Sequence, residues 1–144
     1  PKALAIVDRN EAGAQAVAAE VGGVAYGADL RDEHAVEALI DQIEGAQGPI
    51  DLFCSNVGIG LGRGIDTSSE DWRTIIDINL MAHVFAARTL VPRMVARSGG
   101  YLLNTASAAG LLSQIGSVTY AVTKHAAVSL AEWLSQVLIK ELNL

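Results

Sequence analysis

The 144-residue chain is poor in cysteine, in basic clusters and in long apolar runs. Its single cysteine, Cys54, excludes an internal disulfide and is typical of a protein from the reducing cytoplasm. No apolar run reaches the roughly 18 residues of a membrane span, although hydrophobic residues make up 51% of the sequence. This apolar surplus therefore favours a sheet buried on both faces, or helices that bury surface against a partner.

Positive charge is also scarce. Lys and Arg number 10 against 16 Asp and Glu, which gives a net charge of −6 without any basic cluster. Nucleic acid and anionic membrane surfaces are therefore not expected partners. The chain opens on a strand-like run rather than on a secretory leader, so a cytoplasmic location is expected.

Strand-like and helix-like segments alternate along the chain. Short apolar runs predict strands at 3–7, 24–28, 50–55 and 101–105, and helices are predicted at 11–20, 32–44, 69–97 and from Tyr120 onward. Gly45, Gly48 and Pro49 are expected to end the second helix, and a capping box from Thr67 to Glu70 to begin the third. The alternation and the length predict one α/β domain over residues 1–144 with a parallel sheet.

Tyr120 and Lys124 are four residues apart on a predicted helix, so they lie side by side on one face. An ammonium beside a phenol favours the phenolate, which lowers the tyrosine pKa from its ordinary value near 10. Such a group can move a proton at an alcohol or carbonyl oxygen near neutral pH. The pair also occurs by chance on solvated helix faces, so it is a weak signal alone.

Further motifs precede this pair in a fixed order. They are Asp8 after the first predicted strand, Asp29-Leu30, Asn56-Val57-Gly58, Asn79 and Ser107. With them the chain resembles the short-chain dehydrogenase/reductase family, a Rossmann-type group of nicotinamide-dependent oxidoreductases. The resemblance implies a doubly wound parallel sheet and hydride transfer between NAD(H) and a secondary alcohol or ketone.

The resemblance also implies the catalytic residues. Tyr120 would be the general acid and base, Lys124 would stabilise its phenolate and bind the nicotinamide ribose, and Ser107 would donate a hydrogen bond to the substrate oxygen. Asn79 would hold a water that links Lys124 to solvent. Two plainer interpretations stay open: Ser107 as an ordinary strand-end serine, and Asn79 as a residue that satisfies backbone groups at a helix kink.

The cofactor contacts implied by the resemblance involve Tyr120, Lys124 and seven other residues: Asp8, Arg9, Asp29, Leu30, Asn56, Val57 and Gly58. The Asp8 carboxylate can accept both ribose hydroxyls of NAD and would repel the 2′-phosphate of NADP. Arg9 could weaken this preference by offering that phosphate a partner. Because of the Asp8 carboxylate, NAD is expected in preference to NADP. Asp29 could also be an ordinary strand-end polar residue.

Two parts of the family pattern are missing. The Gly-rich turn that holds the pyrophosphate is absent together with the strand before it, and so is the segment after the catalytic helix. The absent strand is the centre of the family's sheet, so its two neighbours are expected to expose unpaired edges. We therefore expect the sequence to be an incomplete copy of a longer protein.

The remaining signals predict no metal site. His34, His83 and His125 lie on separate predicted helices without Cys or carboxylates at ligand spacing. Cys54 is expected to be a buried small hydrophobe. The Gly-rich stretch 58–64 does not match a dinucleotide-binding turn, and it is expected to form a flexible rim of the substrate pocket.

Helices 69–97 and 120–142 carry apolar residues on more than one face, which predicts a homodimer or homotetramer through this pair. Two other functions stay open. One is a non-catalytic dinucleotide-binding or scaffold protein. The other is an epimerase or dehydratase of nucleotide sugars from the extended branch of the same superfamily.

Overall fold

The computed structural model describes residues 2–62, 64–113 and 116–141, and it divides into two compact units, residues 1–50 and 51–144. Unit 1 contains β1 (Ala5–Asp8), α1 (Glu11–Val21), β2 (Val24–Gly27) and α2 (Glu33–Gln47). Unit 2 contains β3 (Leu52–Ser55), α3 (Ser69–Ile76), the π-helical segment η1 (Asp77–Met81), α4 (Ala82–Ala96), β4 (Tyr101–Asn104), the short 3₁₀ turn η2 (Ala108–Gly110) and α5 (Val118–Glu141). The single domain expected over residues 1–144 stays a prediction.

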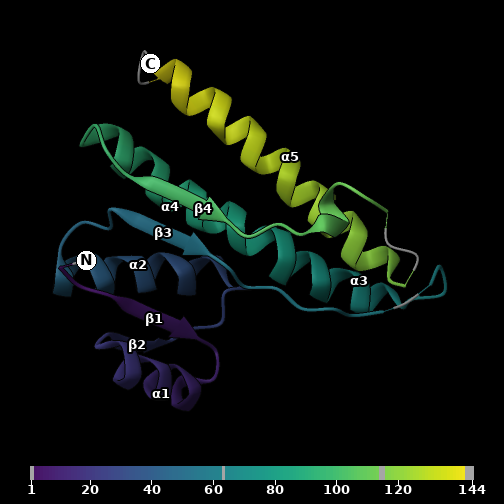
Figure 1. Cartoon of the computed structure of the whole chain (residues 1–144), viewed down its shortest axis with the longest axis horizontal. Coiled ribbons are helices and arrows are strands. Elements are labelled where there is room, and N and C mark those ends of the chain that lie inside the picture. The colour runs from purple at the N-terminus through teal and green to yellow at the C-terminus, as the bar shows by residue number, and fades with distance from the viewer. Residues whose placement is uncertain (1, 63, 114–115, 142–144) are drawn as a thin grey trace. The chain divides into compact units, whose positions relative to one another are not determined.

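In unit 1, β1 and β2 pair in parallel from Ala5 opposite Val24 to Asp8 opposite Gly27. The helix α1 lies against both strands (Figure 1). Asn10 caps its start by accepting a hydrogen bond from the backbone N–H of Gly13. The helix ends at Gly22, where a left-handed φ of 71° suits a residue without Cβ.

In unit 2, β3 and β4 also pair in parallel, from Leu52 opposite Tyr101 to Ser55 opposite Asn104. Side chains alternate between the faces of this pair. Leu52, Cys54 and their partners Tyr101 and Leu103 are exposed on one face. The prediction that Cys54 is buried is therefore wrong, because Cys54 shares its face with exposed residues, whereas Ser55 points to the other, buried side.

One edge of β1 and one edge of β3 carry no paired strand, as expected if a strand between them is missing from the sequence. Within the described residues, β1 pairs only with β2 and β3 only with β4. The parallel pairing and the alternation of strands with helices confirm the α/β class.

The helix predicted at 69–97 begins and ends close to its expected bounds. It runs as α3, η1 and α4 in succession (Figure 1). Ser68 caps it by accepting from the backbone N–H of Asp71, one residue later than a cap at Thr67 would lie. Pro92 lies inside α4, which continues to Ala96. By length and composition this stretch would pass as a membrane span, a test that the core helices of soluble proteins also pass.

Other boundaries also differ from the sequence predictions, since β3 begins at Leu52 rather than at residue 50 and α5 at Val118 rather than at Tyr120. Gly45 does not end α2, because the helix passes through it and stops at Gly48, whose φ is 88°. The first strand starts at Ala5 and includes Asp8, rather than ending before it. The expected end of the last helix at residue 142 lies outside the described residues.

Candidate active site

The helix α5 carries Tyr120 and Lys124 one turn apart, as their spacing predicts. Lys124 is only 3% exposed. Its Nζ donates a hydrogen bond to the backbone oxygen of Thr105 at 3.0 Å and lies 5.7 Å from the centre of the Tyr120 ring. Tyr120 is half-buried. The result is an ammonium held inside the protein beside the ring of a half-buried tyrosine.

Asn79 joins three parts of unit 2. It is fully buried in η1, where its Oδ1 accepts from the backbone N–H of Ile59 at 2.8 Å and its Nδ2 donates to the backbone oxygen of Ile59 at 2.9 Å. Nδ2 also lies 3.2 Å from Thr123 Oγ1 on α5. Asn79 therefore satisfies backbone groups of the loop residue Ile59, whereas the interpretation had expected backbone groups at the helix kink itself. Its link to a proton path stays a prediction.

Two glycines bring the backbone close to Lys124. A Cβ on Gly58 would lie 3.3 Å from Lys124 Nζ and 3.6 Å from Asn79 Oδ1. A Cβ on Gly110 would lie 2.7 Å from the Lys124 backbone oxygen and 2.9 Å from Val128 Cγ2. The two distances at Gly110 are too short for any side chain, so the backbone of η2 packs directly against α5 at Lys124.

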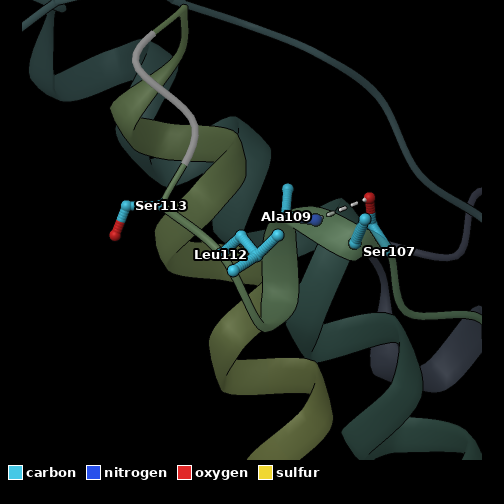
Figure 2. Close-up of a pocket in the computed structure, with 5 residues that line it drawn as sticks. Ser107, Ala109, Leu112 and Ser113 are labelled. Carbon is cyan, nitrogen blue, oxygen red and sulfur yellow. Dashed lines mark hydrogen bonds between the residues drawn. The ribbon is translucent and has the colours of Figure 1, made fainter.

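Ser107 lies on the loop after β4, three residues before Gly110. Its Oγ accepts from the backbone N–H of Ala109 at 3.2 Å and so caps η2 (Figure 2). Ser107 lines an open hollow of about 380 Å³ whose other lining residues are Ala108, Ala109, Leu112 and Ser113. Tyr120 does not line this hollow. The contact of Gly110 with α5 is what ties the Ser107 turn to the Tyr120 helix.

The Gly-rich loop after β3 is tethered to the start of α5. Ser117 Oγ donates to the backbone oxygen of Gly62 at 3.1 Å, and Thr119 Oγ1 donates to that of Leu61. Asn79 holds Ile59 in the same loop. The loop was expected to be a flexible rim, and these contacts fix three of its backbone positions. Residue 63 of this loop lies outside the described residues.

The buried polar side chains of unit 2 form a set of which sequence reasoning identified only Asn79 and Lys124. Among the described residues this set consists of Ser55, Asn79, His83, Thr119, Thr123 and Lys124. It contains no carboxylate. The spacing of Asn79 and His83, four residues apart on one helix, was a signal that could have found it.

His83 is the unusual member of this set. It is 1% exposed, its Nδ1 lies 2.5 Å from Ser55 Oγ, and its Nε2 has no hydrogen-bond partner among the described residues. Burial and then the nearby charge of Lys124 lower the pKa of His83 from 6.5 to about 4. The imidazole is therefore neutral at physiological pH.

The predicted cofactor residues of unit 1 lie at the carboxyl ends of its two strands. Asp8 and Arg9 are exposed, and Asp8 Oδ1 accepts from the backbone N–H of Asn10 at 2.7 Å. Asp29 is paired with the guanidinium of Arg31, whose hydrogen bonds lower the pKa of Asp29 from 3.8 to about 2. Leu30 packs against the core of this unit.

The other predicted cofactor residues follow β3 in unit 2. Asn56 and Gly58 are exposed and Val57 is half-buried. The described residues contain no group of three or more His, Cys, Asp or Glu that could hold a metal ion. The absence of a metal stays a prediction.

Comparison with known proteins decides the family. The profile of the short chain dehydrogenase family matches residues 2–141. The chain belongs to this family. The Rossmann-type α/β fold is confirmed by solved members of it. One from Burkholderia phymatum, in complex with NAD, is 31% identical with a TM-score of 0.84, and the match covers 92% of this chain and 50% of the other. ElxO with NADP bound is 25% identical with a TM-score of 0.86, over 95% and 58%.

Curated relatives of this chain are also longer than the chain itself. The "inactive 2-(S)-hydroxypropyl-CoM dehydrogenase 2" of Xanthobacter autotrophicus is 34% identical, with 92% of this chain and 59% of the relative covered. The 1-deoxy-11-beta-hydroxypentalenate dehydrogenase of Streptomyces exfoliatus is 36% identical, over 74% and 40%. The chain thus spans about half the length of the relatives it matches.

Proposed function

We propose that the protein containing this chain transfers a hydride between NAD(H) and a secondary alcohol or ketone, with Tyr120 as general acid and base. The observation that carries this proposal is the buried ammonium of Lys124, 5.7 Å from the Tyr120 ring centre. Such a charge stabilises the negative charge that develops on a phenol oxygen. A protein that only binds a dinucleotide needs no such arrangement.

The bound nicotinamide would supply the hydride chemistry. The chain's own residues would handle the proton and the substrate oxygen. Tyr120 would take the hydroxyl proton of an alcohol, or return it to a ketone oxygen. Ser107 would donate to that oxygen, since its Oγ accepts from Ala109 and leaves its own hydrogen available. Asn79 would keep the loop at Ile59 and the helix at Thr123 in fixed positions.

The residues present fit a nicotinamide dinucleotide. In unit 2, Gly58 has no side chain to fill the space beside the Lys124 ammonium. This ammonium would bind the hydroxyls of the nicotinamide ribose. In unit 1, the Asp8 carboxylate is exposed and oriented by Asn10, so it can accept the ribose hydroxyls at the adenine end, with Arg9, Asp29 and Leu30 nearby in sequence. Because this carboxylate would repel a 2′-phosphate, we propose NAD rather than NADP.

A non-catalytic dinucleotide-binding protein is the second candidate. It is favoured by the name of the Xanthobacter relative, which is called inactive. The two candidates differ in what Tyr120 must do. Loss of its hydroxyl abolishes turnover in the enzyme and changes nothing in a binding protein beyond affinity.

The experiment follows the absorbance of reduced cofactor when the full-length protein is given NAD and a panel of secondary alcohols. Tyr120→Phe is expected to lower kcat/KM by roughly 10²–10⁴. Tyr101→Phe is the matched control, because Tyr101 is 75% exposed on the β3–β4 face, and it should keep full turnover. Full turnover by Tyr120→Phe would remove the mechanism, and no turnover by the unsubstituted protein would favour the second candidate.

We also propose a homodimer or homotetramer through α5 and the helix formed by α3, η1 and α4, in the cytoplasm. Supporting observations are two large apolar residues of α5, Val122 and Trp133, which are 48% and 60% exposed. Light scattering of the full-length protein should return a mass at least twice that of one chain at micromolar concentration. A monomer at that concentration would contradict the proposal.

A further inference from the structure

Ser55 and His83 form a buried polar pair on the β3–α4 side of unit 2. Ser55 is the last residue of β3 and is 5% exposed, and His83 is 1% exposed one turn after Asn79. The short Ser55 Oγ–His83 Nδ1 distance of 2.5 Å fixes both side chains. Burying polar groups costs free energy unless they are hydrogen-bonded, and here Ser55 and His83 Nδ1 satisfy each other while His83 Nε2 has no partner among the described residues.

This pair is connected to Lys124 through the main chain. The backbone oxygen of Ser55 accepts from the N–H of Thr105 at 2.9 Å, which is the next hydrogen bond after the last paired residues of β3 and β4. The backbone oxygen of Thr105 in turn accepts from Lys124 Nζ at 3.0 Å. The position of the ammonium therefore depends on the conformation of Ser55, the last residue of β3, and of Thr105, the residue that follows β4.

The charge balance of the site requires the imidazole to be neutral. Lys124 on α5 is the charged group that acts on His83, and no carboxylate is buried among the described residues. The other buried polar side chains among the described residues carry no charge: Ser55, Asn79, Thr119 and Thr123. A neutral imidazole can anchor Ser55 without adding a second cation beside the ammonium, which an Arg or Lys at this position could not do.

We propose that His83 is a positioning residue for Lys124: it anchors Ser55, and the Ser55–Thr105 hydrogen bond then fixes the carbonyl that receives the ammonium. This role rests on the proposed function, because Lys124 matters to turnover only if Tyr120 is the acid and base. In this role His83 acts through Ser55 and requires no contact with substrate or cofactor.

The test uses His83→Leu and Ser55→Ala in the full-length protein. Each removes one side of the pair, and Ser55→Ala does so with almost no change in volume, so it keeps the test open if His83→Leu does not fold. Leu90→Ala is the matched control, since Leu90 is fully buried two turns further along α4 and makes no polar contact. His83→Asn keeps a hydrogen-bonding group near the place of Nδ1 and should restore the unsubstituted behaviour.

The first readout does not depend on activity. Reductive methylation of Lys124, followed by mass spectrometry with the exposed Lys2 as internal reference, should be slow in the unsubstituted protein and in Leu90→Ala. It should be several-fold faster in His83→Leu and Ser55→Ala, because the ammonium loses its fixed acceptor. The double variant should react no faster than either single variant, since both act on one contact.

The second readout is turnover. His83→Leu and Ser55→Ala should lower kcat by about tenfold, because each removes the hydrogen bond that is proposed to position Lys124. KM for the alcohol should stay nearly unchanged. The inference is overturned if both variants match Leu90→Ala in labelling and in kcat. Failure of the proposed function is a separate outcome: the unsubstituted protein would show no NAD-dependent turnover, while the labelling comparison would still decide the role of His83.

Discussion

The two units of this chain bury different kinds of side chain. In residues 1–50 the buried side chains that the structure describes are hydrophobic, and Asp8, Arg9 and Asp29 remain partly or fully exposed at the strand ends. In residues 51–144 the described residues include six buried polar or charged side chains, which lie on β3, η1, α4 and α5. Lys124 is one of them. Charge is presented at the surface in one unit and held inside the other.

The difference matches the division of labour that a dinucleotide-dependent enzyme needs. An exposed carboxylate can recognise ribose hydroxyls and reject a phosphate while it keeps its hydration. A buried ammonium acts on its neighbours through a medium of lower dielectric, where each charge has a larger effect. The comparison therefore predicts that substituting the buried polar residues of unit 2 changes the rate, whereas substituting the exposed Asp8 of unit 1 changes cofactor selectivity with little effect on stability.

The largest effect is expected from Lys124→Met. Loss of the ammonium should lower kcat/KM by about 10²–10⁴, because Tyr120 loses the charge that stabilises its phenolate. The free energy of unfolding should stay equal or rise by about 1 kcal/mol, since a buried charge without a carboxylate partner is replaced by an apolar side chain. Urea unfolding and steady-state kinetics check the two parts. Destabilisation by several kcal/mol would show that the buried charge stabilises the fold.

Acid should destabilise unit 2 through His83. The folded pKa of about 4 lies below the ordinary value of 6.5, so the unfolded chain binds the proton more tightly. The contribution to stability is fully present above pH 6.5 and is lost as the pH falls toward 4, by at most about 3 kcal/mol. Urea midpoints measured from pH 7 to pH 4 should show this slope, and His83→Asn should flatten it.

Asp29 provides the contrast in unit 1. The Arg31 hydrogen bonds lower its pKa to about 2, so its contribution is present above pH 3.8 and is lost only as the pH falls toward 2. Because the pair is exposed, the loss should be small. A slope between pH 6.5 and 4 that persists in His83→Asn would contradict the assignment of this window to His83.

Gly110→Ala should be harmful and Gly45→Ala helpful. A Cβ at Gly110 would meet the backbone oxygen of Lys124 at 2.7 Å, which should destabilise the protein by about 1–3 kcal/mol and move the Ser107 turn. Gly45 lies inside α2 with open space around it, so alanine there should stabilise by about 0.5–1 kcal/mol. Thermal unfolding of the two variants checks the signs. Equal effects at both positions would contradict the close packing of η2 on α5.

The smallest effect on stability is expected from Asp8→Ser. The free energy of unfolding should change by less than about 0.5 kcal/mol, because Asp8 is exposed and serine can also accept from Asn10. The ratio of kcat/KM for NADP to that for NAD should rise by roughly tenfold, which corresponds to about 1.4 kcal/mol of removed repulsion. An unchanged ratio would remove Asp8 from the proposed cofactor contacts.

Much of this architecture could be predicted from the sequence, because periodicity and spacing are local properties. The four strands and the pairing of Tyr120 with Lys124 follow from such patterns. The position of the α3 cap at Ser68 rather than Thr67, and the passage of α2 through Gly45, could not be resolved, because neighbouring residues offer nearly equal local choices.

The parts of the site that could not be predicted depend on contacts between distant segments. Thr105 contributes only a backbone oxygen, which no side-chain pattern reveals. Cys54 was predicted to be buried because it lies mid-strand, but the face on which it lies depends on what covers the β3–β4 pair. His83 looked like an isolated histidine because its partner, Ser55, lies 28 residues earlier in the chain.

The π-helical segment at 77–81 has a consequence for how this protein can vary in length. A π turn accommodates one more residue than a regular turn, and each residue of an α-helix advances the rotation by about 100°. Because a π turn holds one residue more than an α turn, deleting one amino acid here would restore a regular helix and leave α3 and α4 nearly in phase. The residues of the π turn itself, Asn79 among them, would change direction and lose their contacts with Ile59 and Thr123. Natural homologues that shorten this helix should therefore do so at its ends and leave the bulge intact.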